Sequence, residues 1–308
     1  MTAIEWTDET WNPVTGCDRV SPGCAHCYAL TLAGRLKAMG QPRYQRDGGK
    51  TSGPGFGVTL HPDKLDQPLR WRKPRMIFVN SMSDLFHEQI PDEYILRVFD
   101  TMRACLHLTG HTFQILTKRP KRMLDICLRA RFDGHGAGRV WLAENAADRG
   151  GYAFLGGLPG CSPLANVWLG VSIENRRFVH RADLLRQTPA AVRFISAEPL
   201  LGPLLFDGSV PSDDVGVPRP EWRNWRDDCD GPKLDLTGID WLIVGGESGI
   251  GHRPMRPEWA RDLRDAAIAN GTAFFFKQDS GARPGQRVRF ADEQEWPRQM
   301  PSEERDPA

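Results

Sequence analysis

Seven short apolar runs, most of them followed by a polar stretch and then a helix-like segment, constrain this 308-residue chain more than any other feature. A run with little polar alternation is typical of a strand that is buried on both faces, as in a parallel sheet. The runs cover residues 57–61, 76–80, 112–117, 167–172, 192–196, 241–245 and 273–277. Helices are predicted at 92–106, 119–130, 176–186 and 257–270. This repeated order of strand and helix predicts an α/β fold, most simply a full or partial parallel (β/α) barrel.

Two stretches do not follow the repeat and are interpreted as insertions between barrel units. Residues 132–166 are rich in glycine and alanine, and residues 207–237 are rich in proline and aspartate. We therefore expect one barrel domain over residues 1–296, with loop-rich insertions at about these two places. The remaining residues, 297–308, are polar and are expected to form a disordered tail.

The bulk composition excludes several classes of protein. Forty basic against thirty-nine acidic side chains give a net charge of +1, so the chain as a whole carries no nucleic-acid signature. No run approaches eighteen apolar residues and the N-terminal region is polar, so we expect a cytoplasmic protein with no membrane partner. An odd count of seven cysteines argues against a disulfide framework. Cys105 and Cys127 lie in helix-like apolar patterns and are expected in the core.

The densest group of chemically reactive residues is the stretch Cys17–Tyr28, which spaces Cys17, Cys24 and Cys27 as C-x6-C-x2-C. Its glycine and proline residues are typical of an irregular loop, whereas residues 28–39 have the apolar stripe of a helix. Three soft thiolate ligands on one short loop suit an iron–sulfur cluster or zinc, with one ligand position left over. Zinc requires a fourth protein ligand, and no second CxxC or HxxxH pair supplies one.

Charged side chains recur where the predicted strands end, which is where the working residues of parallel barrels gather. Glu174, Glu198 and Glu247 each follow an apolar run, and Lys118 and Lys277 also lie at strand ends. A helix cap or a solvated loop charge explains each carboxylate taken alone. Their shared position favours ligand binding, because several buried charges are costly without a ligand or a counter-charge. We expect Lys118 and Lys277 to pair with a carboxylate or phosphate during catalysis.

The triplet Gly245-Gly246-Glu247 ends one of these strands. Two glycines let the backbone approach a ligand closely, and the adjacent carboxylate can hold an ammonium or hydroxyl group. All three residues are therefore predicted to bind a cofactor.

The cysteine loop resembles that of the radical S-adenosylmethionine (SAM) enzymes, in which three cysteines ligate a [4Fe–4S] cluster and the methionine end of SAM chelates the remaining iron. Residues 24–29, Cys-Ala-His-Cys-Tyr-Ala, look most like the DNA-repair photolyase branch, the relatives of spore photoproduct lyase. The whole chain most closely resembles a family of uncharacterised three-cysteine proteins that are common in phages and prophages and are regarded as radical-SAM-like. The resemblance implies a radical SAM barrel whose cluster is bound by Cys17, Cys24 and Cys27, with SAM as the second cofactor.

Residues 76–84 and 115–125 are similar to the photolyase-type branch as well. There, a strand that ends in a short polar stretch with Asp is followed by a strand that ends in Thr-Lys. This similarity implies that Asn80, Ser83 and Asp84 lie near the methionine group of SAM, and that Lys118 lines the same cavity. The Gly-Gly-Glu triplet at 245–247 resembles the motif that binds the amino group of SAM.

The implied activity is reductive cleavage of SAM, driven by an external electron donor, followed by hydrogen abstraction from a substrate. Basic clusters at 70–75 and 118–122, and tryptophans among arginines at 219–226, favour a nucleic-acid or nucleotide substrate, although solvated loops explain them too. Two alternatives remain open. One is a zinc-stabilised nucleic-acid-binding protein without catalysis. The other is a cluster-bearing scaffold or regulator that acts with a phage-module partner protein.

Overall fold

The computed structural model describes residues 4–132, 140–142, 152–153, 163–205, 232–285 and 296–301. Cys161, Cys229 and most of the two predicted insertions lie outside these residues. The chain divides into two compact units. The first comprises Met1–Val171 and Leu184–Phe194, and the second comprises Ser172–Asp183 and Ile195–Ala308. The two units are described separately below.

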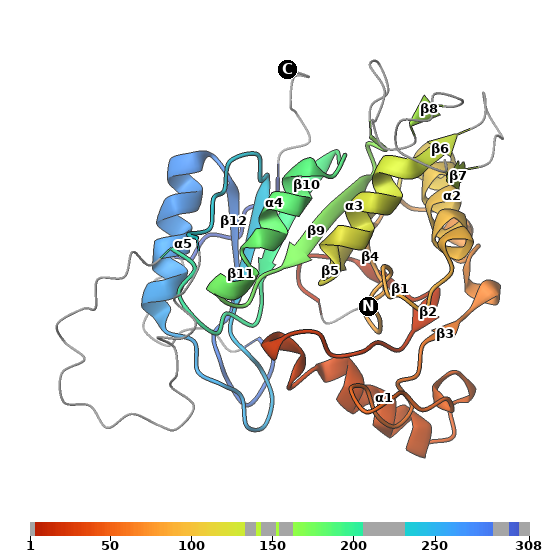
Figure 1. Ribbon diagram of the computed structural model, residues 1–308, viewed down its shortest axis with the longest axis horizontal. Helices are drawn as coiled ribbons and strands as arrows, with labels where there is room; N and C mark the ends of the chain where they lie inside the picture. The colour runs from red at the N-terminus through yellow and green to blue at the C-terminus, as the bar shows by residue number, and fades with distance from the viewer. Residues whose placement is uncertain are drawn as a thin grey trace. The chain divides into compact units, whose positions relative to one another are not determined.

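Parallel strands form the core of the first unit. β1 (Glu9–Trp11) pairs with β4 (Met76–Val79), β4 with β5 (Thr112–Thr117), and β5 with β9 (Val167–Ser172), all in parallel register. The interior positions of these strands are almost all buried. Apolar runs at these places therefore form strands buried on both faces, as predicted (Figure 1).

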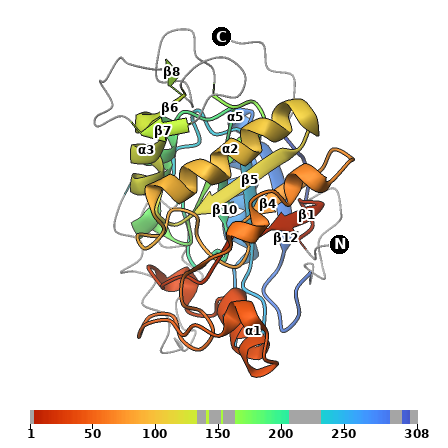
Figure 2. The same cartoon turned by 90° about the vertical axis from the view of Figure 1, so that its right-hand side faces the viewer.

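Three helices belong wholly to the first unit: α1 (Tyr28–Ala38), α2 (Asp92–Leu108) and α3 (Pro120–Arg129). α2 buries Ile95, Phe99, Met102 and Cys105, which recur at helical spacing on one face, and it runs alongside β5 (Figure 2). α3 begins with proline at its first turn, where the missing N–H costs nothing. These helices agree with the predicted segments.

The apolar run 57–61 does not join the parallel sheet. It contains only the short β3 (Thr59–Leu60), which pairs antiparallel with β2 (Val14–Thr15) next to the cysteine loop. A second small sheet has the order β7-β6-β8, from β6 (Ala130–Phe132), β7 (Val140–Leu142) and β8 (Tyr152–Ala153). Short 3-10 turns occur at Pro22–Cys24, Pro42–Tyr44, Pro62–Lys64 and Pro68–Arg70.

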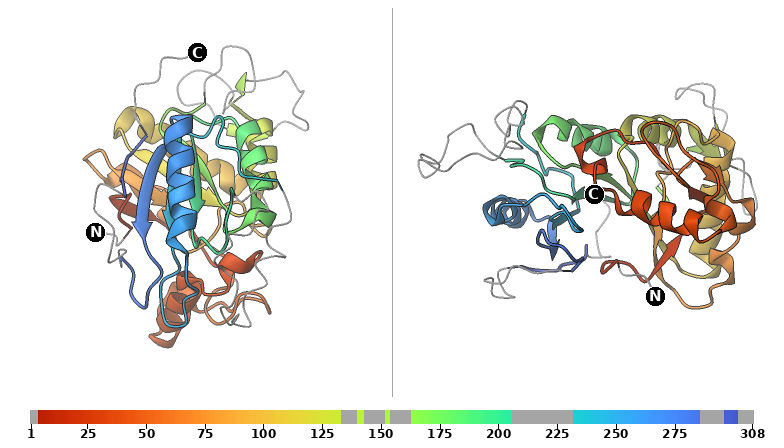
Figure 3. Two further views of the ribbon diagram at one scale, coloured as in Figure 1. Left: turned by 90° about the vertical axis from the view of Figure 1, so that its left-hand side faces the viewer. Right: turned by 90° about the horizontal axis from the view of Figure 1, so that it is seen from below.

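The second unit contains β11 (Trp241–Gly245) and β12 (Ala273–Gln278), a parallel pair covered by α5 (Pro257–Asn270), as Figure 3 shows. α5 ends at Gly271, whose φ of 70° is the left-handed conformation that favours glycine. Residues 297–299, placed by the prediction in the tail, hydrogen bond along β12. The turn at Arg176–Phe178 precedes α4 (His180–Gln187), and β10 (Val192–Ala197) follows it.

The strand order of the main sheet is β1-β4-β5-β9-β10-β11-β12. Six of its strands coincide with predicted apolar runs, so the α/β class and the parallel pairing are confirmed. This order is compatible with a partial β/α barrel. The radical SAM type of barrel stays a prediction.

Candidate functional site

The cysteine loop enters the first unit through a glycine that no other residue could replace without strain. Gly16 has a φ of 90°, and a Cβ at this position would collide with the carbonyl of Gly57. Cys17 follows directly, and its N–H donates to the Phe56 carbonyl. Cys24 ends a 3-10 turn and Cys27 is the N-cap residue of α1. The loop is therefore built from local turns and attached to the unit at its first cysteine.

The three loop cysteines are partly exposed residues, unlike the two other described cysteines. Cys105 and Cys127 are buried in α2 and α3, as predicted, and no disulfide joins the described cysteines. Among the residues that the structure describes, no group of three or more His, Cys, Asp or Glu side chains has an arrangement that holds a metal ion. The loop thus gathers Cys17, Cys24 and Cys27 without converging them on one point.

Asp84 joins the end of β4 to the end of β5. Its carboxylate accepts hydrogen bonds from the Thr117 hydroxyl at 2.7 Å, the Lys118 N–H at 3.1 Å and the Phe86 N–H at 3.0 Å. It also accepts one from a terminal nitrogen of Arg119 at 3.1 Å. The side chain is buried and bound on all sides by the protein itself. Asp84 therefore orients its neighbours in this structure, and its predicted contact with SAM stays a prediction.

The Arg119 guanidinium extends from this junction to the cysteine loop. Its Nε donates to both carboxylate oxygens of Glu88 at 3.0 Å, and the terminal nitrogen that contacts Asp84 also lies 3.4 Å from the Cys17 sulfur. The other terminal nitrogen lies 3.4 Å from the Asp18 carbonyl. Burial disfavours the charged form, but Asp84, Cys17 and Glu88 together raise the pKa of Arg119. Burial and Asp84 raise the pKa of the Cys17 thiol to about 12.

A second polar group adjoins the loop at Asp18. One carboxylate oxygen accepts from the hydroxyls of Thr51 and Ser52 at 2.9 and 3.0 Å, and the other lies 3.0 Å from Nε2 of His87. Burial opposes this charge, yet these hydrogen bonds lower the pKa of Asp18. Asp18 also lines a polar cavity of about 140 Å³ together with Arg46.

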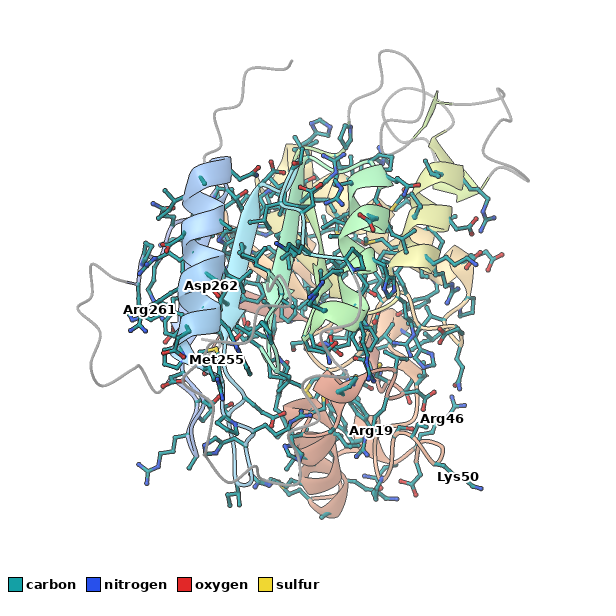
Figure 4. All side chains as sticks on the ribbon, turned by 60° about the vertical axis from the view of Figure 1, so that its left-hand side comes forward. Arg19, Arg46, Lys50, Met255, Arg261 and Asp262 are labelled. Carbon is teal, nitrogen blue, oxygen red and sulfur yellow. The ribbon has the colours of Figure 1, made fainter. Side chains whose placement is uncertain are left out.

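Basic side chains surround this part of the first unit. Arg19, Arg46 and Lys50 are exposed, and Figure 4 shows them together near the loops that follow the cysteines. Asp18 and Asp47 line the same cavity as Arg46, so this surface carries charges of both signs.

Asn80 is the most unusual residue at the end of β4. Its φ of 61° is the left-handed conformation, which no other non-glycine residue among those described adopts. Its side chain is buried, and neither its amide nitrogen nor its amide oxygen has a hydrogen-bond partner among the described residues. A buried unpaired amide and a left-handed backbone are both costly, so Asn80 is a candidate for ligand binding, which stays a prediction.

The other two predicted residues of this region differ in how they are held. The Ser83 hydroxyl donates to the Val14 carbonyl at 2.9 Å, which joins the segment to β2. The Lys118 side chain is half-buried and forms no ion pair among the described residues. The Ser83 hydroxyl is therefore used within the protein, whereas the Lys118 amine has no carboxylate partner among the described residues.

In the second unit, all three predicted carboxylates form internal ion pairs, and the carboxylates of Glu174 and Glu247 are the most buried. Glu174 is fully buried and lies 3.0 Å from Arg181, which also donates to the Ser172 carbonyl. Glu247 accepts from both the backbone N–H and the side chain of Arg253, at 2.8 and 3.0 Å. These contacts give both carboxylates a structural role, and binding of a ligand by either stays a prediction.

Glu198 is more exposed and pairs with Lys277 at 3.0 Å. Both predicted residues therefore meet, Glu198 after β10 and Lys277 on β12. The carboxylate lies against Gly245, where a Cβ would collide with it. A Cβ on Gly246 would collide with the backbone of Ser280. The missing side chains of the two glycines are therefore required by the close approach of the Glu198 carboxylate and the Ser280 backbone.

Comparison with known proteins identifies one family. A family described as "Protein of unknown function (DUF5131)" matches residues 1–299, nearly the entire chain. The chain belongs to the DUF5131 family. Neither a curated protein nor a solved structure matches it. The predicted relation of this DUF5131 protein to phages, to radical SAM enzymes and to photolyases therefore stays a prediction.

Sequence reasoning missed two features of the DUF5131 site. Arg119 was interpreted as part of a basic cluster facing a substrate, but it is buried among Asp84, Glu88 and Cys17. Asp18 and His87 were not singled out, because a pair separated by 69 residues leaves no local pattern. The position of Arg119 two residues after the strand-end threonine was the available signal. Within the described residues, no helix is long and apolar enough to cross a membrane.

Proposed function

We propose that this DUF5131 protein is a radical-SAM-like iron–sulfur protein that binds a [4Fe–4S] cluster through Cys17, Cys24 and Cys27. The observation that carries the proposal is the contrast among the five described cysteines. Two are buried in helices, whereas three are partly exposed on one eleven-residue stretch of loop. Cysteines on a partly exposed loop are more available as metal ligands than cysteines buried in helices.

The donor set fits a cluster better than it fits one ion. Three thiolates are the protein's share of a cluster that keeps one iron for an outside ligand. Each cysteine would bind a separate iron of the cluster, so the three sulfurs need not meet around one centre. Binding would still draw the thiols together, because the described side chains do not yet form a metal-holding group. Ordering of a loop by its metal is common in small metal sites.

Asn80 supports the second half of the proposal, the binding of SAM. When bound, the cluster would supply one-electron reduction of the SAM sulfonium. The chain's own share is to hold the methionine end of SAM, which carries a carboxylate and an ammonium group. The unpaired amide of Asn80 has a donor for the first and an acceptor for the second. The two residues that follow Asn80 connect it to the cysteine loop. The Ser81 carbonyl accepts from the Tyr28 hydroxyl, and the Met82 carbonyl accepts from the Gly16 N–H.

The proposed substrate is a nucleic acid or nucleotide. Within the cluster 118–122, Arg119 and Arg122 are committed to internal carboxylates and carbonyls, so they do not face a substrate. Lys118 and the exposed Lys121 remain to bind phosphate. In the second unit, the partly exposed Lys277–Glu198 pair is a further candidate for substrate contact.

The experiment begins with protein purified without oxygen. Iron, sulfide and zinc contents and the visible spectrum are measured, then dithionite and SAM are added and 5′-deoxyadenosine is quantified. We expect brown protein that cleaves SAM, loss of both properties in Cys24→Ala, and retention of both in the control Cys105→Ala. Colourless protein with one zinc would instead favour the non-catalytic nucleic-acid-binding alternative. A cluster without SAM cleavage would favour the scaffold or regulator.

A further inference from the structure

The guanidinium of Arg119 contacts only the first of the three loop cysteines among the described contacts. Arg119 lies 3.4 Å from the Cys17 sulfur and 3.4 Å from the Asp18 carbonyl, so it grips the first cysteine and the peptide beside it. The described contacts of Cys24 and Cys27 include no guanidinium, and the Cys24 sulfur lies 3.9 Å from the Ser21 hydroxyl. The first cysteine is therefore fixed by a cation that the other two lack.

Burying the Arg119 guanidinium is costly, which indicates that the fold specifies its contact with Cys17. Arg119 is 7% exposed, and a buried cation is expensive unless it is paired and hydrogen bonded. Asp84 and Glu88 hold it from two directions, and Asp84 is itself positioned by the Thr117 hydroxyl and the Lys118 N–H. The planar fork of an arginine can serve all these acceptors at once, which a lysine cannot.

We propose that Arg119 is a positioning residue of the metal centre, which keeps Cys17 in place and donates an N–H to its sulfur. This inference rests on the proposed function, because it assumes that Cys17 binds a metal. Cys17 would be the preset ligand, and Cys24 and Cys27 would complete the protein's share of the ligands. A hydrogen bond and a positive charge at a ligating sulfur favour the reduced state of a cluster, so Arg119 would also raise the reduction potential of a cluster bound here.

The test compares Arg119→Gln with Arg129→Gln in the full chain. Arg129 is a control arginine on α3, since it is partly buried and paired with Asp92 and Asp125 but has no described contact with the loop. Two quantities are measured on each protein: metal retention in competition with a chelator, and the midpoint potential of the cluster followed by its spectrum. We expect Arg119→Gln to weaken metal retention about 10- to 100-fold and to shift the potential to more negative values. The control should behave like the wild type.

Because Arg119→Gln leaves Asp84 without its cation, Glu88→Gln provides a milder variant. The Glu88 side chain is 67% exposed, so its change spares the fold while it loosens the grip on Arg119. We expect smaller shifts of the same sign in both quantities.

Equal behaviour of Arg119→Gln, Glu88→Gln and the control would overturn the inference alone. A wild-type protein that binds zinc would overturn the proposed function, while weaker zinc retention in Arg119→Gln would still support the role of Arg119. A wild-type protein that binds neither metal would overturn both.

Discussion

The two units differ in how their buried carboxylates are paired with cations. In the second unit, each strand-end carboxylate has its own cation: Glu174 with Arg181, Glu198 with Lys277, and Glu247 with Arg253. In the first unit, Arg119 contacts two carboxylates, a thiol and a carbonyl. Separate pairs can be changed one at a time, whereas a shared cation couples its partners. The first unit is therefore where a change at one residue should reach a reactive group.

The largest effect that tests this comparison is expected at the most buried pair. Arg181→Met removes a cation beside Glu174, which has no solvent exposure. Leaving a buried charge without its partner typically costs about 3–5 kcal/mol. Urea unfolding of Arg181→Met should show a loss of that order, and the double variant Glu174→Gln, Arg181→Met should recover part of it. A loss below about 1 kcal/mol would contradict a structural role for this pair.

Acid is expected to weaken the first unit before the second. Burial lowers the pKa values of His61 and His111 below 6.5, so the unfolded chain binds more protons there. Their stabilising contribution is complete above pH 6.5 and falls at lower pH, by up to about 1.4 kcal/mol per pH unit for each histidine. In the second unit, burial raises the pKa values of Asp262 and Asp279, so their contribution is retained at low pH and is lost as pH rises through the raised values.

Hydrogen exchange between pH 7 and pH 5, corrected for intrinsic rates, measures this difference. Peptides of the first unit should lose protection first. Replacing His111 with Gln should reduce the pH slope of unfolding, because its lowered pKa is the source of that slope. Equal loss of protection in both units would contradict the prediction that buried histidines make the first unit more sensitive to acid.

A smaller effect on stability, joined to a large effect on function, is expected at Glu198. Its carboxylate and Lys277 keep 14% and 25% exposure, and a solvent-accessible pair contributes about 0–1 kcal/mol. Glu198→Gln should therefore change the unfolding midpoint little but reduce product formation by the metal-loaded protein. If Glu198→Gln destabilised the protein as much as Arg181→Met, the two carboxylates would have the same structural role.

The smallest effect on stability is expected at Asn80. Glycine adopts its left-handed φ without a Cβ penalty, so Asn80→Gly should alter the free energy of unfolding by no more than about 1 kcal/mol. The same change removes the unpaired amide and should weaken SAM binding, as measured by titration calorimetry. Asn80→Asp is the matched variant, which keeps the side-chain size and adds charge. Unaltered SAM affinity in both variants would leave the amide without a ligand.

The secondary structure was largely predictable because buried parallel strands have the sequence pattern of short apolar runs. The segments that became β4, β5, β9, β10, β11 and β12 needed no tertiary information. The run 57–61 was the exception, since it is apolar but pairs with the two-residue β2 instead of the parallel sheet. Its partner strand is too short for any pattern to reveal.

The candidate site was predictable in position but not in partners. Strand-end location singled out Asn80, Glu198 and Lys277, and Glu198 and Lys277 do form an ion pair, whereas ligand binding by any of the three stays a prediction. The cation beside Glu174 lies on α4, and the role of Arg119 depends on Asp84, which is 35 residues away. Such contacts arise from tertiary packing, and a charged residue reads the same in the sequence whether solvent or a carboxylate surrounds it.

The chain path between the two units limits how they can be dissected. It passes from the first unit to the second after Val171, returns at Leu184, and leaves again after Phe194, so α4 and β10 each begin in one unit and end in the other. No single cut yields two intact halves: a fragment that stops at Val171 lacks the Leu184–Phe194 segment. Fragment complementation would therefore need an overlap through residue 194. A circular permutant, which keeps this crossing covalent, is the better route to opening the chain elsewhere.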